Sequence, residues 1–267
     1  MTRTAVIVQA RMASTRLPGK VLLPLGGTTV LDHVLARCAS ISGADIVCCA
    51  VPDTADSDPV AEEAERIGKR TGARVIRGSE SDVLDRYYQA ARAVGAERIL
   101  RVTSDCPLID PRVCECVLNL LAERNADYAA NNMPPSWPHG LDCEAFSFDW
   151  LERAAKEAHE PFEREHVTPY IRIHRDVRKV NLEGPGGELA TYRWTLDTPA
   201  DLTFMRAIFE RLPPGDGAWR YEVPLAILEA EPQLSTLNAG DNVRLSKDGH
   251  AQNPASVGLC MTPGRAG

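Results

Sequence analysis

Short apolar runs alternate with longer amphipathic segments through the first 120 residues of the chain. The apolar runs, which we expect to form buried strands, lie at residues 5–8, 45–51, 73–77 and 98–103. Apolar residues at helical spacing predict helices at residues 30–39, 59–71 and 111–121, and a further helix that Ser79 caps and that runs to residue 93. This alternation predicts an α/β fold in three layers, with helices on both faces of a mixed, mostly parallel sheet. Ligands of such sheets bind beyond the carboxyl ends of the strands.

The second half of the chain is less regular. We expect strands at residues 127–132 and 190–196, an edge strand at 143–148, and helices at 149–158, 199–212 and 223–229. No internal repeat or clear linker divides the sequence, so we expect one domain over residues 1–245, with a distinct subregion in its second half. Residues 246–267 contain few large apolar side chains. We therefore expect a flexible tail there.

The composition excludes several broad classes of protein. The 267 residues include 37 acidic and 30 basic ones, for a net charge of −7, which disfavours a general nucleic-acid binder. No apolar run approaches the roughly 18 residues of a membrane span, and the first residues lack the apolar stretch of a signal peptide. The eight cysteines form no Cys-x-x-Cys pair. We expect them to be reduced in a cytoplasmic protein without nucleic-acid or membrane partners.

A cationic loop follows the first expected strand. Arg11, Arg16 and Lys20 are spaced among small residues and one glycine. Small residues let backbone N–H groups approach an anion, and the cations offset its charge. The pattern is neither the P-loop motif nor the dinucleotide-binding motif. It predicts an anion-binding loop, although an ordinary surface loop with solvated cations would show the same residue types.

Two aspartates follow expected strands in the same way. Asp105 precedes a proline turn, and Asp197 precedes the Thr198–Asp201 segment, which has the pattern of a capping box. Together they could hold Mg²⁺ between the protein and phosphate oxygens. The alternatives are a turn-forming role for Asp105 and a capping role for Asp197. A third polar cluster, residues 78–86, also falls at the carboxyl edge of the expected sheet.

The run A-R-M-A-S-T-R-L-P-G-K at residues 10–20 resembles the N-terminal signature of sugar-nucleotide cytidylyltransferases. This group includes the CMP-Kdo and CMP-sialic acid synthetases, and Gln9 and Met12 are most similar to the branch named after spore coat polysaccharide biosynthesis protein F. The resemblance implies a Rossmann-like nucleotide-diphospho-sugar transferase fold. The segments at 103–107 and 194–202 also resemble the family, which implies that Asp105 and Asp197 bind Mg²⁺.

The resemblance also implies roles for individual residues. The implied catalytic residues are Arg16, Lys20 and Asp105. The implied nucleotide-binding residues are Ala10, Arg11, Ser14, Arg16, Lys20, Gly78, Ser79, Asp82 and Arg86. The implied acceptor-binding residues are His139, Asp142, Glu144, Arg164 and His166. A solvated Arg86 at a helix start and an Arg164 in a surface Arg–Glu network are the structural alternatives, and either histidine could serve as a base.

The implied reaction transfers CMP from CTP to a sugar for surface polysaccharide synthesis and releases pyrophosphate. Gln9, Met12 and the H-G-L-D-C-E run at residues 139–144 differ from CMP-Kdo synthetases, so the expected acceptor is a nonulosonic acid or another surface-polysaccharide sugar rather than Kdo. Relatives commonly form homodimers, so we expect one here. The alternatives are a glycosyltransferase of the same fold and a noncatalytic nucleotide-binding protein. The cationic loop favours the first function, because glycosyltransferases of this fold normally carry an Asp-x-Asp metal motif instead.

Overall fold

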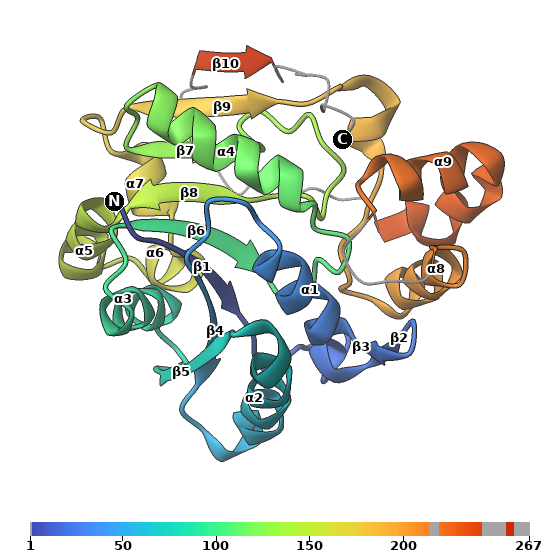
Figure 1. Ribbon diagram of the computed structural model, residues 1–267, viewed down its shortest axis with the longest axis horizontal. Helices are drawn as coiled ribbons and strands as arrows, with labels where there is room; N and C mark the ends of the chain where they lie inside the picture. The colour runs from blue at the N-terminus through green and yellow to red at the C-terminus, as the bar shows by residue number, and fades with distance from the viewer. Residues whose placement is uncertain (1, 214–218, 242–254, 259–267) are drawn as a thin grey trace.

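The computed structural model describes residues 2–213, 219–241 and 255–258. One large sheet crosses the molecule in the strand order β10-β9-β7-β8-β6-β1-β4-β5 (Figure 1). Its strands are β1 (Thr4–Gln9), β4 (Ile46–Pro52), β5 (Arg74–Gly78), β6 (Arg98–Thr103), β7 (Tyr128–Ala130), β8 (Glu144–Ser147), β9 (Lys179–Glu183) and β10 (Ala255–Gly258). Every neighbouring pair is parallel except the two that β8 makes with β6 and β7. The predicted mixed, mostly parallel sheet is confirmed.

Helices cover both faces of the sheet and complete the three predicted layers. The α-helices are α1 (Val30–Ala39), α2 (Asp58–Thr71), α3 (Val83–Ala93), α4 (Pro111–Glu123), α5 (Phe148–Glu157), α6 (Pro161–His166), α7 (Pro169–Ile173), α8 (Pro199–Phe209) and α9 (Glu222–Ala230). Helices α1, α2 and α4 pack on one face, and α3, α5 and α7 pack on the other. Alternate residues of β1 point into the two cores, Val6 and Val8 into the first and Ala5 and Ile7 into the second.

The first half of the chain follows its sequence signals closely. The Thr29 hydroxyl accepts a hydrogen bond from the Asp32 N–H at the start of α1, as its capping pattern predicts. Helix α2 ends at Gly72, which adopts a left-handed conformation with φ of 78°. The strands and the other three helices expected here lie within about two residues of their predicted ends, whereas α3 begins three residues later than predicted, because Asp82 rather than Ser79 is its N-cap.

Two predictions for the second half are wrong, and one strand was not predicted. Residues 143–148 were expected at a sheet edge, but β8 lies inside the sheet, where Glu144 is buried among ionic partners that its alternating pattern does not reveal. Residues 190–196 form no strand. The 3₁₀ helix η3 (Gly187–Thr191) is followed by an extended segment with one bridge, between Arg193 and His139. Strand β9 was missed, because five residues with a charge at each end give a weak signal.

The remaining segments are short. They are the 3₁₀ helices η1 (Lys20–Leu22), η2 (Ala55–Ser57) and η4 (Pro232–Asp241) and the two-stranded ribbon of β2 (Pro24–Leu25) and β3 (Thr28–Thr29). Of the tail expected at 246–267, residues 255–258 form β10, and the other residues lie outside the described part of the chain. No helix among the described residues is long and apolar enough to cross a membrane.

Candidate active site

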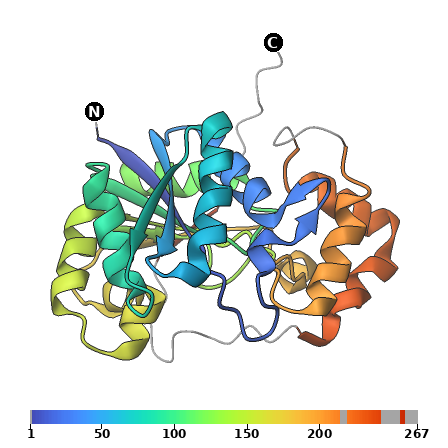
Figure 2. The same ribbon diagram turned by 90° about the horizontal axis from the view of Figure 1, so that it is seen from below.

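The cationic loop and the two strand-end aspartates meet at one point. The Lys20 ammonium donates to Asp105 Oδ2 at 2.7 Å and to Asp197 Oδ1 at 2.8 Å. Arg16 Nη2 lies 3.1 Å from Asp197 Oδ1. Segments 177 residues apart in sequence therefore converge at the carboxyl edge of the sheet. Figure 2 shows the loop after β1, in dark blue, beside the elements of the C-terminal region in orange.

Local backbone turns aim Lys20 at this point. Gly19 has φ of 66°, and its N–H donates to the Met12 carbonyl at 3.2 Å, which closes the loop on itself. The Ser14 hydroxyl accepts from the Leu17 N–H at 3.4 Å. The left-handed conformation at Gly19 turns the chain into η1, whose first residue is Lys20. Arg11 and Arg16 remain exposed on the outside of this loop, where they can meet an anion.

A backbone contact holds the two aspartates side by side. The Leu196 N–H donates to the Asp105 carbonyl at 2.8 Å, and the Thr195 hydroxyl donates to the same oxygen at 3.4 Å. The segment before Asp197 is in turn fixed to His139, because the Trp194 N–H donates to the His139 carbonyl at 2.5 Å. The backbone of the extended 192–196 segment is thus hydrogen-bonded to the Asp105 loop and to the His139 loop. This explains why the segment pairs with no neighbouring strand of the sheet.

Opposite charges set the electrostatics of this cluster. Burial alone would lower the pKa of Lys20, but the carboxylates of Asp105 and Asp197 outweigh it, and the pKa is raised. The side chains of Lys20 and Asp197 are 13% and 16% exposed. The cluster therefore holds a protonated lysine between two carboxylates at the carboxyl edge of the sheet.

The donor set at this point fits a divalent cation. Two carboxylates approach one positive centre within 2.8 Å, and hard oxygen ligands are those that Mg²⁺ prefers. Within the described parts of the chain, no group of three or more His, Cys, Asp or Glu side chains is arranged to bind a metal. Mg²⁺ commonly takes one or two protein carboxylates and completes its shell with water and substrate phosphates. Asp105 and Asp197 match that pattern.

The residues expected to contact the nucleotide at 78–86 build a turn at the end of β5. Arg86 is buried rather than solvated, and its guanidinium donates to the Ser79 carbonyl and, at 3.5 Å, to the Glu80 carbonyl. Burial lowers the pKa of Arg86. Asp82 caps α3 by accepting from the Asp85 N–H at 2.9 Å. Arg86 and Asp82 thus shape this loop, while Gly78 and Ser79 lie partly exposed along it.

The five residues expected to bind the acceptor lie in three separate places. His139 lies next to Arg193, which donates to Asp197, and Asp142 lies next to His139: His139 Nδ1 is 3.4 Å from Arg193 Nη1, and His139 Nε2 is 3.8 Å from Asp142 Oδ2. Arg164 and His166 belong to α6, where Arg164 Nε donates to Asp82 Oδ2 at 2.9 Å and the His166 ring lies 4.4 Å from that of Phe162. Arg164 therefore pairs with the N-cap of α3, across 82 residues, rather than with a neighbouring glutamate.

Glu144, the fifth of these residues, lies in a buried ionic cluster. It pairs with Arg101 and lies 3.7 Å from Arg172, and it accepts from the Tyr128 and Thr168 hydroxyls at 2.5 and 2.8 Å. Burial would raise the pKa of Glu144, but the two arginines and the hydroxyls lower it to about 2. Its contacts join β6, β7, β8 and α7 beneath the candidate site.

Arg193, which was not predicted from the sequence, also contacts the site. Its Nη2 donates to Asp197 Oδ2 at 2.9 Å. A charged residue inside the apolar run Tyr192–Leu196 was the available signal, since a buried arginine requires partners.

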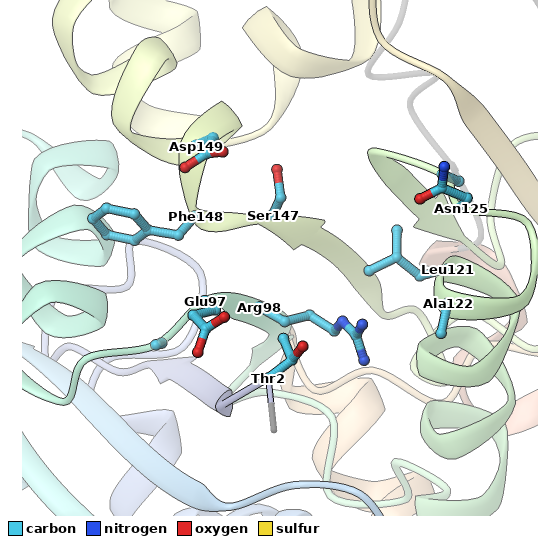
Figure 3. Close-up of a pocket in the computed structure, with 11 residues that line it drawn as sticks. Thr2, Glu97, Arg98, Leu121, Ala122, Asn125, Ser147, Phe148 and Asp149 are labelled. Atoms are coloured by element: carbon cyan, nitrogen blue, oxygen red, sulfur yellow. The ribbon is translucent and has the colours of Figure 1, made fainter.

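A cavity of about 370 Å³ lies at the opposite edge of the sheet. Figure 3 shows Arg98 reaching toward Leu121 and Ala122 of α4, with Ser147 and Asp149 at the start of α5. Arg98 begins β6, whereas Asp105 follows its carboxyl end. This cavity is therefore separate from the cluster around Lys20, and convergent charge identifies the candidate site better than cavity size does.

Comparisons with known proteins identify the family of this chain. Residues 5–206 match the family described as Cytidylyltransferase. The chain is 33% identical to spore coat polysaccharide biosynthesis protein SpsF of Bacillus subtilis over 242 residues, which cover 88% of this chain and 98% of that protein. It is also 36% identical to an uncharacterized protein of Methanocaldococcus jannaschii over 197 residues, 73% of this chain and 78% of the relative.

A solved structure of a cytidylyltransferase from Leptospira borgpetersenii serovar Hardjo-bovis superposes with a TM-score of 0.80 at 28% identity. The match covers 88% of this chain and 97% of that one. The chain belongs to the cytidylyltransferase family and is a nucleotidyltransferase of the nucleotide-diphospho-sugar transferase fold. Both the family and the branch indicated by the 10–20 motif are confirmed.

Proposed function

We propose that the protein is a Mg²⁺-dependent enzyme that transfers CMP from CTP to a sugar and releases pyrophosphate. The observation that carries this proposal is the contact of Lys20 with both Asp105 and Asp197. A cationic loop joined to a pair of carboxylates is what a triphosphate and its counter-cation require. Family membership supports the nucleotide, CTP.

Each charged residue has a defined task in this reaction. Arg11, Arg16 and Lys20 neutralise the triphosphate and the departing pyrophosphate, while Ser14 and the Ala10 backbone shape the loop around it. Asp105 and Asp197 would hold Mg²⁺, which supplies Lewis-acid polarisation of the α-phosphate when bound. Such a reaction depends on positioning and charge neutralisation. None of the buried cysteines is needed as a nucleophile.

The acceptor proposed is an acidic sugar of the nonulosonic class or a related surface-polysaccharide sugar. The similarity to a spore coat polysaccharide biosynthesis protein supports a role in surface glycan synthesis. His139 lies 3.4 Å from Arg193, which donates to Asp197, and Asp142 lies next to His139, so either residue can orient an acceptor hydroxyl near the aspartates. We also propose a cytoplasmic enzyme that acts as a homodimer, which the resemblance to its family supports.

The glycosyltransferase alternative gains no support from the carboxylates. One Asp-x-Asp triplet occurs in the sequence, at Asp56–Asp58. Asp56 is exposed, and Asp58 pairs with Arg77 at 2.7 Å at the start of α2. The carboxylates that meet the cationic loop are instead those of Asp105 and Asp197.

Nucleotide-resolved pyrophosphate release tests the proposed function. The protein is mixed with Mg²⁺, each of the four nucleoside triphosphates, and acidic nine-carbon sugars, Kdo or sugar 1-phosphates. Release with CTP and one acceptor class supports the proposal and identifies the acceptor. Absence of release with every acceptor, despite CTP or nucleotide-sugar binding, contradicts it in favour of the transferase or noncatalytic function.

A further inference from the structure

Arg193 connects the site to a buried carboxylate. Its side chain is 3% exposed and lies against Asp201, whose side chain is fully buried. Arg193 Nε donates to Asp201 Oδ1 at 2.8 Å, and Nη2 donates to Asp201 Oδ2 at 3.0 Å. The same Nη2 donates to Asp197 Oδ2 at 2.9 Å. The planar guanidinium therefore fixes two carboxylates at once, which a lysine ammonium cannot do with the same geometry.

This arrangement gives the two oxygens of Asp197 different partners. Oδ2 is held by Arg193 from inside the protein, and Oδ1 faces Lys20 and Arg16 at 2.8 and 3.1 Å. The backbone is fixed as well, because the Asp197 N–H donates to Asp201 Oδ2 at 2.9 Å. With one oxygen and the main chain anchored, the direction of the other oxygen is determined before any ligand binds.

The anchor extends to a segment outside the matched family residues. Asn238, in η4, is 4% exposed. Its Nδ2 donates to the Arg193 carbonyl at 2.9 Å and to Asp201 Oδ1 at 3.0 Å. The family match ends at residue 206, and Asn238 therefore connects the C-terminal region to the site.

We propose that Arg193 is a positioning residue that orients Asp197 toward the cation and the triphosphate, and that Asp201 and Asn238 hold Arg193 in place. The inference rests on the proposed function, because Asp197 needs a fixed direction only if it holds a cation. Groups that hydrogen-bond to metal ligands typically contribute about 10- to 100-fold to metal affinity. An effect of that size is expected here.

The test measures Mn²⁺ binding by electron paramagnetic resonance in the presence of CTP and without an acceptor. Removal of Arg193 alone would leave the Asp201 charge buried and unpaired. The variants are therefore Arg193→Lys and the double change Arg193→Met with Asp201→Asn, which keeps an oxygen to accept from the Asp197 N–H. The matched control is Arg211→Met, since Arg211 forms an exposed fork with Glu231.

We expect the double variant to weaken Mn²⁺ binding by about 10- to 100-fold and Arg193→Lys to weaken it less. The double variant should still bind CTP in the absence of metal as the parent does, and the control variant should bind Mn²⁺ as the parent does. A general loss of structure would instead weaken both CTP binding and Mn²⁺ binding. Mn²⁺ affinity equal to that of the parent in a folded double variant overturns the proposal. If the double variant does not fold, the same comparison is made with Arg193→Lys, where parent-like affinity again overturns it.

A reference variant separates this proposal from the proposed function. Asp197→Asn should itself weaken Mn²⁺ binding. If Asp197→Asn loses affinity and both Arg193 variants keep it, only the positioning role fails. If Asp197→Asn also keeps the affinity of the parent, the proposed cation site fails.

Discussion

At the scale of single residues, position along a strand was the most informative signal. Asp105 and Asp197 each lie just past an apolar run, Lys20 lies in the loop that follows the first strand, and the structure brings all three together. The partners of Glu144 could not be predicted in this way. They come from β6, β7 and α7, and nothing in the H-G-L-D-C-E run shows that its glutamate faces two arginines inside the protein. Local sequence patterns identify residues that follow the carboxyl ends of strands. The burial of a charged side chain such as that of Glu144 depends instead on how the whole fold assembles.

Replacement of Glu144 by Gln is expected to change how stability depends on pH. The pKa of Glu144 is lowered to about 2 in the folded protein, from an ordinary value near 4.5. The unfolded chain therefore binds more protons between these values, and the stabilisation is complete above pH 4.5 and is lost as the pH falls toward 2. A shift of this size corresponds to a contribution on the order of 3 kcal/mol.

Denaturant unfolding from pH 7 down to pH 3 measures this contribution. The parent should lose unfolding free energy more steeply below pH 4.5 than Glu144→Gln, which should be less stable at pH 7 because Arg101 and Arg172 lose a charged partner. Equal slopes for the two proteins would show that Glu144 is not the titrating group. Glu65→Gln, a change at an exposed position of α2, is the control.

At the scale of elements, the capping patterns and apolar periodicities predicted most helices correctly. The 192–196 segment was predicted wrongly because its apolar residues fill a core, as in a strand, while its backbone bonds to loops rather than to a neighbouring strand. The segment can bond to the His139 loop because its backbone approaches the backbone of Gly140 closely. Gly140 has φ of 121°, and a side chain there would collide with the Trp194 carbonyl. A sequence pattern cannot show which glycine lies against which carbonyl.

Gly140→Ala should therefore push the His139 loop away from the 192–196 segment that precedes Asp197. We expect a loss of about 1–3 kcal/mol in unfolding free energy, together with reduced CTP-dependent turnover, because the strained conformation and the collision act together. Gly43→Ala is the matched control, because Gly43 also has a positive φ, of 82°, but faces open space. Calorimetry and pyrophosphate release measure the two effects. A Gly140 variant as active as the Gly43 variant would show that this approach does not position Asp197.

At the scale of the whole molecule, the order of the strands in the sheet determines where the residues of the candidate site meet. Parallel strands β1 and β6 are neighbours, so the loops that carry Lys20 and Asp105 emerge side by side at one edge. The antiparallel β8 reverses the direction once and brings Glu144 and the His139 loop to that same edge. The class of sheet followed from the alternation in the first half. The position of β8 between β6 and β7, and the contact of Asn238 in η4 with Asp201, could not be predicted in this way. Both depend on contacts between residues that are distant in sequence.

Transfer of label from [α-³²P]CTP tests the central claim most directly. With Mg²⁺ and the acceptor class that supports pyrophosphate release, label should pass from CTP to the sugar in step with unlabelled pyrophosphate. Asp105→Asn, which removes a carboxylate charge at the same volume, should slow this transfer by about 100-fold or more while CTP still binds. Label that stays in CTP with every acceptor, or an Asp105→Asn variant that transfers it as fast as the parent, would contradict the proposed function.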